Sequence, residues 1–341
     1  MAEQASNDLQ EIVHTLSETW KGIMITIGVK SGIFSRLNHN LPQSLDDLAT
    51  LTGYDRMKLA RWLYFTSKFG LTRQHEDGYL LTPKSALFLE GSPFKDIQGF
   101  VKLTDFFQDA AVNCNETLKP GGSLDKLTEG KITRNYQPNV SDNLSMVLFD
   151  IFTQYKMKEG DSLLDIGAGM GNFVRAIAAR IPGLQISGFD SNLFAIDTAK
   201  SENKRLGLSD RVKMVVGDAR TDLVEYKNRS IDWVTLINVF HFYPIKDRLA
   251  LVDQMIRIAR KGVFMTEIVI ENPLSAGANP LMSLLWEDFT GFFTQEEADE
   301  LNRAIVRKHP HHQLTKIPIL QNTSHLVVIT PKNSDEKDVT P

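Results

Sequence analysis

A glycine-rich segment in the second half of the chain has the residue types of a ligand-binding turn. The segment from Leu163 to Phe173 reads LLDIGAGMGNF, in which an apolar stretch leads into Gly167, Gly169 and Gly171. The first two glycines let backbone approach a ligand with no side chain in the way, and the third lets a helix pack close to the strand. The pattern predicts a nucleotide-binding turn, but dinucleotide-dependent dehydrogenases use a similar one, so the turn alone leaves the nucleotide open.

Polar residues end the apolar stretches that follow. Asp190 closes the sequence SGFD, Asp218 lies in GDAR, and Asn238 ends the next stretch. A carboxylate in the position of Asp190 can accept hydrogen bonds from both ribose hydroxyls, and one at Asp218 can accept from an adenine amino group. Each acid taken alone is equally compatible with a helix cap. It is the ordered set along one sheet edge that indicates a nucleotide site.

The elements that must position these residues alternate between strands and helices. Strands are predicted at 162–166, 185–189, 212–216, 231–237 and 263–270, with helices at about 171–181, 192–206 and 245–260. This alternation predicts an α/β fold with a Rossmann-like, mostly parallel sheet covered on both faces. Two further apolar stretches, 317–320 and 325–330, flank a turn signal and predict an antiparallel C-terminal hairpin on the sheet edge.

The N-terminal region has a different organisation. Apolar residues at helical spacing predict one helix over 12–27 and a second that ends at about Leu37, and Ser44 and Asp55 can cap the next two helices. A strand at 78–82 then completes the pattern of helices and a small β wing that is typical of a winged helix. We therefore predict a winged-helix domain over 1–92, a helical cover over 93–158, a catalytic domain over 159–332 and a disordered tail over 333–341.

The composition of the chain limits the classes of function that it can have. The chain has 341 residues, a formal net charge of −4 and one cysteine, Cys114. The charge gives no strong field for nucleic acid or an anionic membrane, and a single cysteine excludes an intramolecular disulfide. No apolar run approaches the roughly 20 residues that span a bilayer, and the first residues lack the apolar stretch of a secretory signal. A soluble, cytoplasmic protein is expected.

The ordered motifs resemble those of the class I S-adenosylmethionine-dependent methyltransferases. The glycine spacing and the GFD and GDA strand ends are similar to that family's pattern, and the likeness extends over about residues 8–331. The sequences GVKSGIF at 28–34 and KFGL at 68–71 look like the N-terminal domain of one branch, the dimerising small-molecule enzymes that include caffeic-acid and hydroxyindole O-methyltransferases. The resemblance implies S-adenosyl-L-methionine as the cofactor, a small-molecule acceptor, and a homodimer formed through the N-terminal domain.

The same resemblance implies roles for individual residues. The cofactor would be held by residues of the four strand ends: Asp165, Gly167, Gly169, Gly171, Asp190, Ser191, Asp218, Ala219 and Asn238. His241 matches the family's general base, and Glu267 matches one of the carboxylates that flank it. The acceptor would contact aromatic residues: Tyr136, Tyr155, Phe242, Tyr243, Trp286 and Phe289. The family's second flanking carboxylate falls near 291–294, where this chain has phenylalanine instead of an acid.

These residues predict methyl transfer to a hydroxyl, with His241 accepting the proton because imidazole can do so near neutral pH. A second hypothesis is S-methylation of a small thioether such as 4-methylthio-2-hydroxybutyrate, on the route to dimethylsulfoniopropionate, which needs no base. The sulfonium product would be stabilised by aromatic faces. A dinucleotide-dependent dehydrogenase and a non-enzymatic winged-helix regulator that senses S-adenosylmethionine are further alternatives. The tract His309-Pro-His-His312 is interpreted as a solvated connection, and no metal site is predicted.

Overall fold

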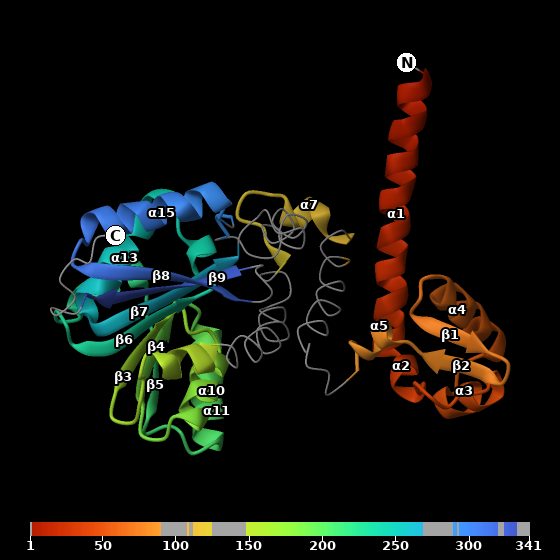
Figure 1. Cartoon of the computed structure of the whole chain (residues 1–341), viewed down its shortest axis with the longest axis horizontal. Coiled ribbons are helices and arrows are strands. Elements are labelled where there is room, and N and C mark those ends of the chain that lie inside the picture. Colours follow the sequence, from red (N-terminus) through yellow and green to blue (C-terminus); the bar gives the residue numbers. More distant parts are fainter. Residues whose placement is uncertain are drawn as a thin grey trace, which may run out of the picture. The chain divides into compact units, whose positions relative to one another are not determined.

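The computed structural model describes residues 2–89, 108, 112–124, 148–268, 289–291, 293–319 and 324–332. By its internal contacts the chain divides into two compact units, 1–109 and 110–341 (Figure 1). None of the helices in these ranges is both long and apolar enough to cross a bilayer.

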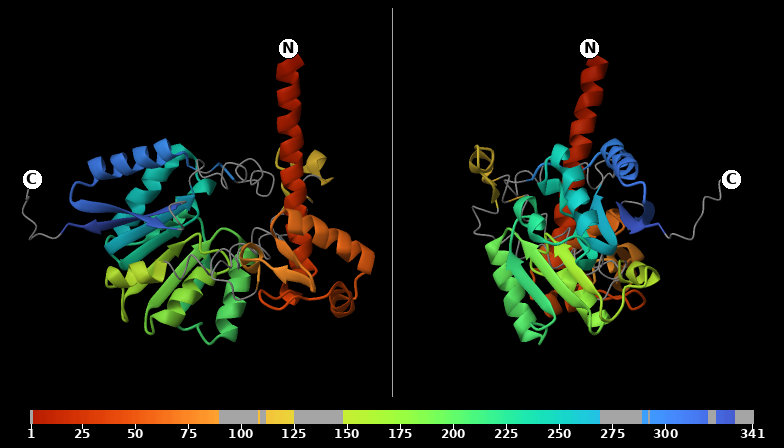
Figure 2. Two further views of the ribbon diagram at one scale, coloured as in Figure 1. Left: turned by 45° about the vertical axis from the view of Figure 1, so that its right-hand side comes forward. Right: turned by 90° about the vertical axis from the view of Figure 1, so that its left-hand side faces the viewer.

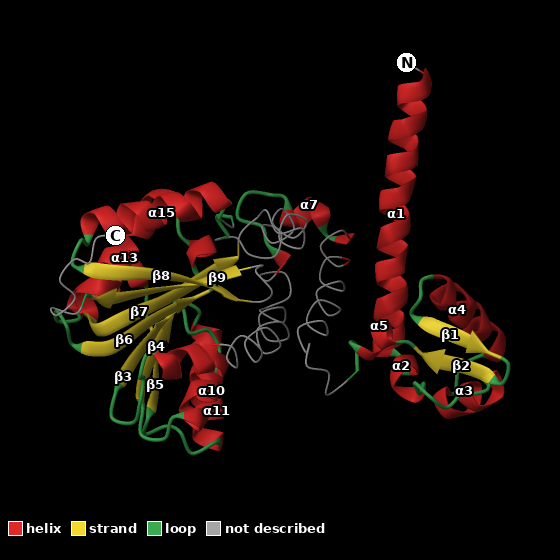
Figure 3. Cartoon of the chain, viewed as in Figure 1, coloured by secondary structure: helices red, strands yellow, loops and turns green. Residues whose placement is uncertain are grey.

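The first unit consists of helices followed by a two-stranded antiparallel hairpin (Figure 3). Its elements are α1 (Ala2–Lys30), α2 (Ile33–Arg36), α3 (Leu45–Thr52), α4 (Arg56–Lys68), β1 (Thr72–His75), β2 (Gly78–Leu81) and α5 (Pro83–Ala86). The two predicted caps are confirmed, because Ser44 Oγ accepts from the Asp47 amide at 3.0 Å and Asp55 Oδ1 accepts from the Lys58 amide at 2.9 Å. α1 is longer than predicted, and the second helix is a single turn.

A close contact around Gly28 organises the core of this unit. The rings of Phe34 and Trp62 pack with centroids 5.4 Å apart, and both residues are buried with Leu48 and Leu63. A Cβ atom on Gly28 would lie 2.4 Å from the Phe34 ring and 2.7 Å from the Trp62 ring. Glycine at this position therefore lets α1 approach the aromatic pair.

The second unit contains a seven-stranded sheet in the order β5-β4-β3-β6-β7-β9-β8. The strands are β3 (Ser162–Ile166), β4 (Gln185–Asp190), β5 (Val212–Val216), β6 (Ile231–Ile237), β7 (Ala259–Ile268), β8 (His312–Ile319) and β9 (Ser324–Pro331). β3 to β7 are parallel, and β9 runs antiparallel between β7 and β8. The predicted fold class, with its antiparallel C-terminal hairpin, is confirmed. From β3 the chain adds β4 and β5 on one side and then crosses to add β6 and β7 on the other. Sheets of this kind bind ligands at the carboxyl ends of the strands that flank this crossover, here β3 and β6.

Helices cover both faces of this sheet, as the views in Figure 2 show. α10 (Asn172–Arg180) and α11 (Leu193–Arg205) share one apolar cluster with the sheet, whereas α13 (Ile245–Ile258) and α15 (Gln295–Lys308) share the other. Short helical turns complete the unit: α7 (Cys114–Thr117), α12 (Ala219–Asp222), η1 (Leu223–Glu225) and η2 (Phe240–Phe242).

The sequence-based expectation missed α15 and the early part of two strands. α15 begins at a capping box in which Thr294 Oγ1 accepts from the Glu297 amide while the Glu297 carboxylate accepts from the Thr294 amide. β7 begins at Ala259 rather than at residue 263, and β8 begins at His312, within the tract interpreted as a connection. His309 caps α15, and its ring lies 2.7 Å from Asp253 Oδ1.

Two glycines of α1 give a matched test of this packing. Replacing glycine by alanine inside a helix favours folding by roughly 0.5–1 kcal/mol when space is available. Gly22 has no atom within 4 Å of an added Cβ, so Gly22→Ala should raise the stability of the first unit. Gly28→Ala should lower it by about 1–3 kcal/mol, because the buried rings must move apart. Hydrogen exchange of the amides at 33–81 measures both effects, and equal effects of the two variants would contradict the argument.

Candidate active site

The glycine turn after β3 is held in a conformation that side chains rarely adopt. Gly167, Gly169 and Gly171 have φ angles of 69°, 52° and 74°. A Cβ on Gly167 would lie 2.6 Å from Cγ2 of Val239, which follows β6. The Gly169 amide donates a hydrogen bond to Asp190 Oδ2 at 2.8 Å. The turn is therefore tied directly to the ends of both neighbouring strands.

Two carboxyl groups lie beside this turn, of which Asp165 is buried and Asp190 is half-buried. Asp190 Oδ1 also accepts from the Asn192 amide at 2.9 Å, and burial raises the pKa of Asp190 despite these backbone donors. Asp165, at the end of β3, accepts from Thr235 Oγ1 at 2.7 Å. Burial raises the pKa of Asp165 to about 7, with the Thr235 hydrogen bond opposing the rise and the charge of Asp190 adding to it.

The carboxyls beside this turn bear on whether a pyrophosphate or a positively charged ligand fits it better. In a dinucleotide site, the amides of the glycine turn face a pyrophosphate anion. Here the Gly169 amide is already used by Asp190, and the neighbouring Asp165 adds negative character. A ligand that brings positive charge stabilises the ionised form of these two carboxyls, whereas pyrophosphate destabilises it. Beside these carboxyls, a positively charged ligand would be tolerated better than a pyrophosphate.

The end of β5 supplies a second, more exposed carboxylate. Asp218 Oδ1 accepts from the Arg220 amide at 2.9 Å, and the Arg220 guanidinium contacts both carboxylate oxygens. Its side-chain hydrogen bond to Arg220 lowers the pKa of Asp218. Ala219 is buried in the turn that follows, while Ser191, which follows β4, is exposed.

Tyr243 lies beside Asp218 and Ala219, whereas the sequence predicted it only as a contact of the acceptor. Burial raises the pKa of Tyr243 to about 12, the charge of Asp218 adds to that rise, and a hydrogen bond with the Ala219 backbone opposes it. The tyrosine hydroxyl therefore lies beside the predicted adenine-binding residues. No sequence motif pointed to this contact, because it joins segments that follow different strands.

The end of β6 turns sharply at Asn238. This residue has a φ of 56°, a left-handed conformation that asparagine tolerates better than most residues. Its amide donates to the Thr266 carbonyl of β7 at 2.9 Å. The turn directs the following residues, Phe240–Phe242, into the single helical turn η2 at the carboxyl edge of the sheet.

His241 is buried within η2, with 8% of its surface exposed. Its ring lies 4.4 Å from the ring of Phe242 and 5.4 Å from that of Phe289. Its backbone carbonyl accepts from the Thr290 amide at 2.6 Å and from Thr290 Oγ1 at 2.8 Å. The histidine is therefore enclosed by aromatic rings and tied to the 289–291 segment.

The remaining predicted residues fall into two groups. Glu267 lies in β7 opposite His325 of β9, but its side chain is outside the described residues, as are Tyr136 and Trp286. Tyr155 is half-buried and packs edge-on against Phe264 at 5.6 Å, so its described contact is one of core packing.

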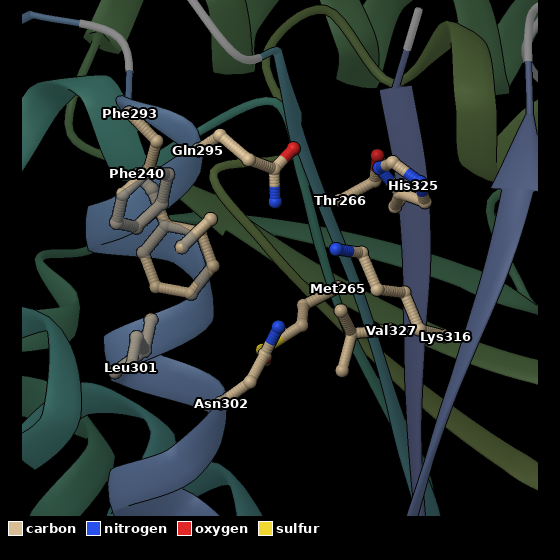
Figure 4. A pocket seen from close by; sticks show the side chains of 11 residues that line it. Phe240, Met265, Thr266, Phe293, Gln295, Leu301, Asn302, Lys316, His325 and Val327 are labelled. Atoms are coloured by element: carbon tan, nitrogen blue, oxygen red, sulfur yellow. The ribbon is translucent and has the colours of Figure 1, made fainter. Parts of the chain in front are cut away.

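A small pocket adjoins η2 on the α15 face of the sheet (Figure 4). Its lining combines apolar and polar side chains: Phe240, Met265, Thr266, Phe293, Gln295, Ala298, Leu301, Asn302, Lys316, His325 and Val327. Lys316 Nζ lies 3.0 Å from Asp299 Oδ1. Within the described residues, no group of three histidine, cysteine or acidic side chains is arranged to hold a metal ion.

Comparisons with known proteins agree with this geometry. Residues 163–262 match a family model described as a methyltransferase domain. Among curated proteins, a myricetin O-methyltransferase from Catharanthus roseus is 24% identical over 199 residues, which cover 52% of this chain and 56% of the relative. The chain thus spans little more than half of that relative's length.

Solved structures share the fold along nearly the whole chain. The S-adenosylmethionine-dependent methyltransferase SibL, in its apo form, has a TM-score of 0.72 at 17% identity, covering 95% of this chain and all of that one. The mitomycin 7-O-methyltransferase MmcR has a TM-score of 0.66 at 17% identity, covering 97% of this chain and all of that one. The parallel-sheet unit therefore contains a region that matches a methyltransferase domain, and the chain has the same fold as these solved methyltransferases.

Proposed function

We propose that the protein transfers the methyl group of S-adenosylmethionine to a hydroxyl of a small-molecule acceptor. The observation that carries this proposal is the buried His241, which follows Asn238 at the same sheet edge as the cofactor residues. When bound, S-adenosylmethionine supplies an electrophilic methyl group. The acceptor oxygen forms a bond to that carbon as the carbon–sulfur bond breaks, and the hydroxyl proton passes to the imidazole of His241. The cofactor leaves as S-adenosylhomocysteine.

The cofactor would be held by the strand ends already described. The glycine turn would give backbone access, Asp190 would accept from the ribose, and Asp218 would accept from the adenine amino group. The carboxyls of Asp165 and Asp190 would suit the positive charge of the sulfonium. We extend the predicted set by Tyr243, whose hydroxyl lies beside Ala219 and Asp218.

A second candidate function is S-methylation of a small thioether, because His241 is flanked by aromatic rings. Phe242 and Phe289 lie within 5.4 Å of it by ring centroids, and aromatic faces stabilise a sulfonium cation. A thioether has no proton to lose, so this reaction needs no base. A thioether acid such as 4-methylthio-2-hydroxybutyrate represents the class.

We also propose that the first unit is a winged-helix dimerisation domain that pairs with a second copy of the chain. Its helices and antiparallel hairpin fit that type of domain. Large apolar side chains are exposed along α1, where Trp20 is 64%, Val13 55% and Ile27 42% accessible. Burying such residues against a partner would remove apolar surface from water.

Cofactor binding can be tested with Asp190→Asn. Loss of a charge-assisted hydrogen bond costs roughly 1.5–3 kcal/mol, so affinity for S-adenosylhomocysteine should fall about 10- to 100-fold. Asp197→Asn is the matched control, because Asp197 is exposed on α11. Titration calorimetry measures both variants, and an unchanged affinity for Asp190→Asn would remove this residue from the site.

The role of His241 is tested by His241→Gln. General-base catalysis is worth about 100-fold or more, so turnover should fall by at least that factor and the wild-type rate should rise with pH. Acceptors are found by screening hydroxyl, thiol, thioether and carbon nucleophiles with labelled S-adenosylmethionine, and the exposed His311→Gln serves as control. A loss below about tenfold, with a thioether as the accepted nucleophile and a rate independent of pH, would favour S-methylation instead.

The oligomeric state is tested by placing a charge on α1. Trp20→Glu should convert a dimer into a monomer at micromolar protein, because a carboxylate would be buried in an apolar interface. Val306→Glu is the control, since Val306 is a half-exposed apolar residue on α15 of the other unit. Sedimentation velocity measures both variants, and a monomeric wild-type chain would refute the dimer.

A further inference from the structure

Arg248 of α13 is the largest fully buried side chain of the described residues. Only 2% of its surface is exposed, although it carries a permanent charge. Burying an arginine is costly unless its donors are well satisfied. The groups that satisfy its donors lie next to the segment that contains His241.

The guanidinium joins two segments that are distant in the sequence. Nε donates to the Tyr243 carbonyl at 2.8 Å, and Nη2 donates to the Gly291 carbonyl at 3.1 Å. The guanidinium carbon lies 4.1 Å from the centre of the Phe293 ring, which in turn packs against Phe240 at 5.4 Å. One side chain thus contacts the residue that follows η2, Gly291 and Phe293, and Phe293 in turn packs against η2.

Thr290 completes the same connection. Its amide and its hydroxyl both donate to the His241 carbonyl, and the hydroxyl lies 3.1 Å from the Tyr243 carbonyl. The backbone of His241 is therefore fixed by Thr290, and the backbones on both sides of this contact, at Tyr243 and Gly291, are fixed by Arg248.

We propose that Arg248 is a positioning residue for methyl transfer: it locks the 289–291 segment onto η2 and so sets the orientation of the His241 ring. The inference rests on the proposed role of His241 as the base. In this chain phenylalanine occupies the region where the resembling enzymes have a second flanking carboxylate. Backbone clamping by Arg248 and Thr290 supplies orientation without a carboxylate in that region.

The contacts require arginine rather than any cation. A planar guanidinium can donate in two directions while its face lies on an aromatic ring, which the compact ammonium of lysine cannot do. Arg257, on the same helix, gives a matched comparison. It donates to the carbonyls of Tyr226 and Leu223 at 2.6 and 2.8 Å, at a place removed from η2.

The first test compares Arg248→Lys with Arg257→Lys in the full-length protein. Misplacing a catalytic group by about 1 Å costs on the order of 100-fold, so Arg248→Lys should lower kcat by at least about tenfold. The affinity for S-adenosylhomocysteine should stay within about threefold of wild type, whereas Arg257→Lys should leave both quantities unchanged. Equal losses in the two variants, or a parallel loss of S-adenosylhomocysteine affinity, would reduce Arg248 to a general structural residue and overturn the proposal.

A double-mutant cycle then asks whether Arg248 acts through His241. If it does, Arg248→Lys should lower kcat by less than about threefold further in the His241→Gln background. Losses that multiply would overturn the proposal.

The imidazole signal of His241 in nuclear magnetic resonance spectra, assigned with His241→Gln, gives a readout that does not depend on turnover. Arg248→Lys should shift this signal and Arg257→Lys should not, and an unmoved signal in Arg248→Lys contradicts positioning. If His241→Gln itself loses less than about tenfold in kcat, the base fails, whereas a shifted signal still supports the clamp.

Discussion

The hydrogen bond from the Gly169 amide to the Asp190 carboxylate is the constraint on which the rest of the site depends. It can form only because Gly169 adopts a positive φ and because β4 ends where the turn after β3 passes. It leaves Asp190 with acceptor capacity for a ligand while fixing the direction of its carboxylate. The turn and the acid therefore form one unit, and neither would have its present geometry without the other.

The same turn also sets the position of η2, which lies on the side of the site where we propose that the acceptor binds. Gly167 has no side chain, so Val239 can pack against it, and Val239 lies between Asn238 and the helical turn that carries His241. Asn238 is bonded to β7 through Thr266, which fixes the other side of this passage. The glycine turn and the segment that carries His241 are thus linked by the packing of Val239 on Gly167 and by the hydrogen bond from Asn238 to Thr266.

Local sequence patterns predicted most of the sheet and the helix caps, because strand ends, glycines and capping residues act over a few positions. Strands β3, β5 and β6 have the predicted bounds, whereas α15 was missed although Thr294 and Glu297 form its capping box. The site was less predictable where contacts join distant segments. Arg248 reaches the carbonyl of Gly291, 43 residues further along the chain, and nothing in the pattern around either residue indicates the contact. Tyr243 likewise contacts Ala219 through the packing of two turns.

The two sides of the site differ in charge, and this difference bears on turnover. The side proposed to hold the cofactor has the carboxyls of Asp165 and Asp190, which would favour a positively charged ligand. Methyl transfer converts the sulfonium of the cofactor into a neutral thioether, so the product loses an attraction that the reactant had. The acceptor side has two aromatic rings beside His241, and in the proposed reaction this side would gain the transferred carbon and, for a hydroxyl acceptor, a proton on the imidazole. In the proposed reaction, positive charge would leave the side that carries the two carboxyls, and this would weaken the hold on S-adenosylhomocysteine once the methyl group has left.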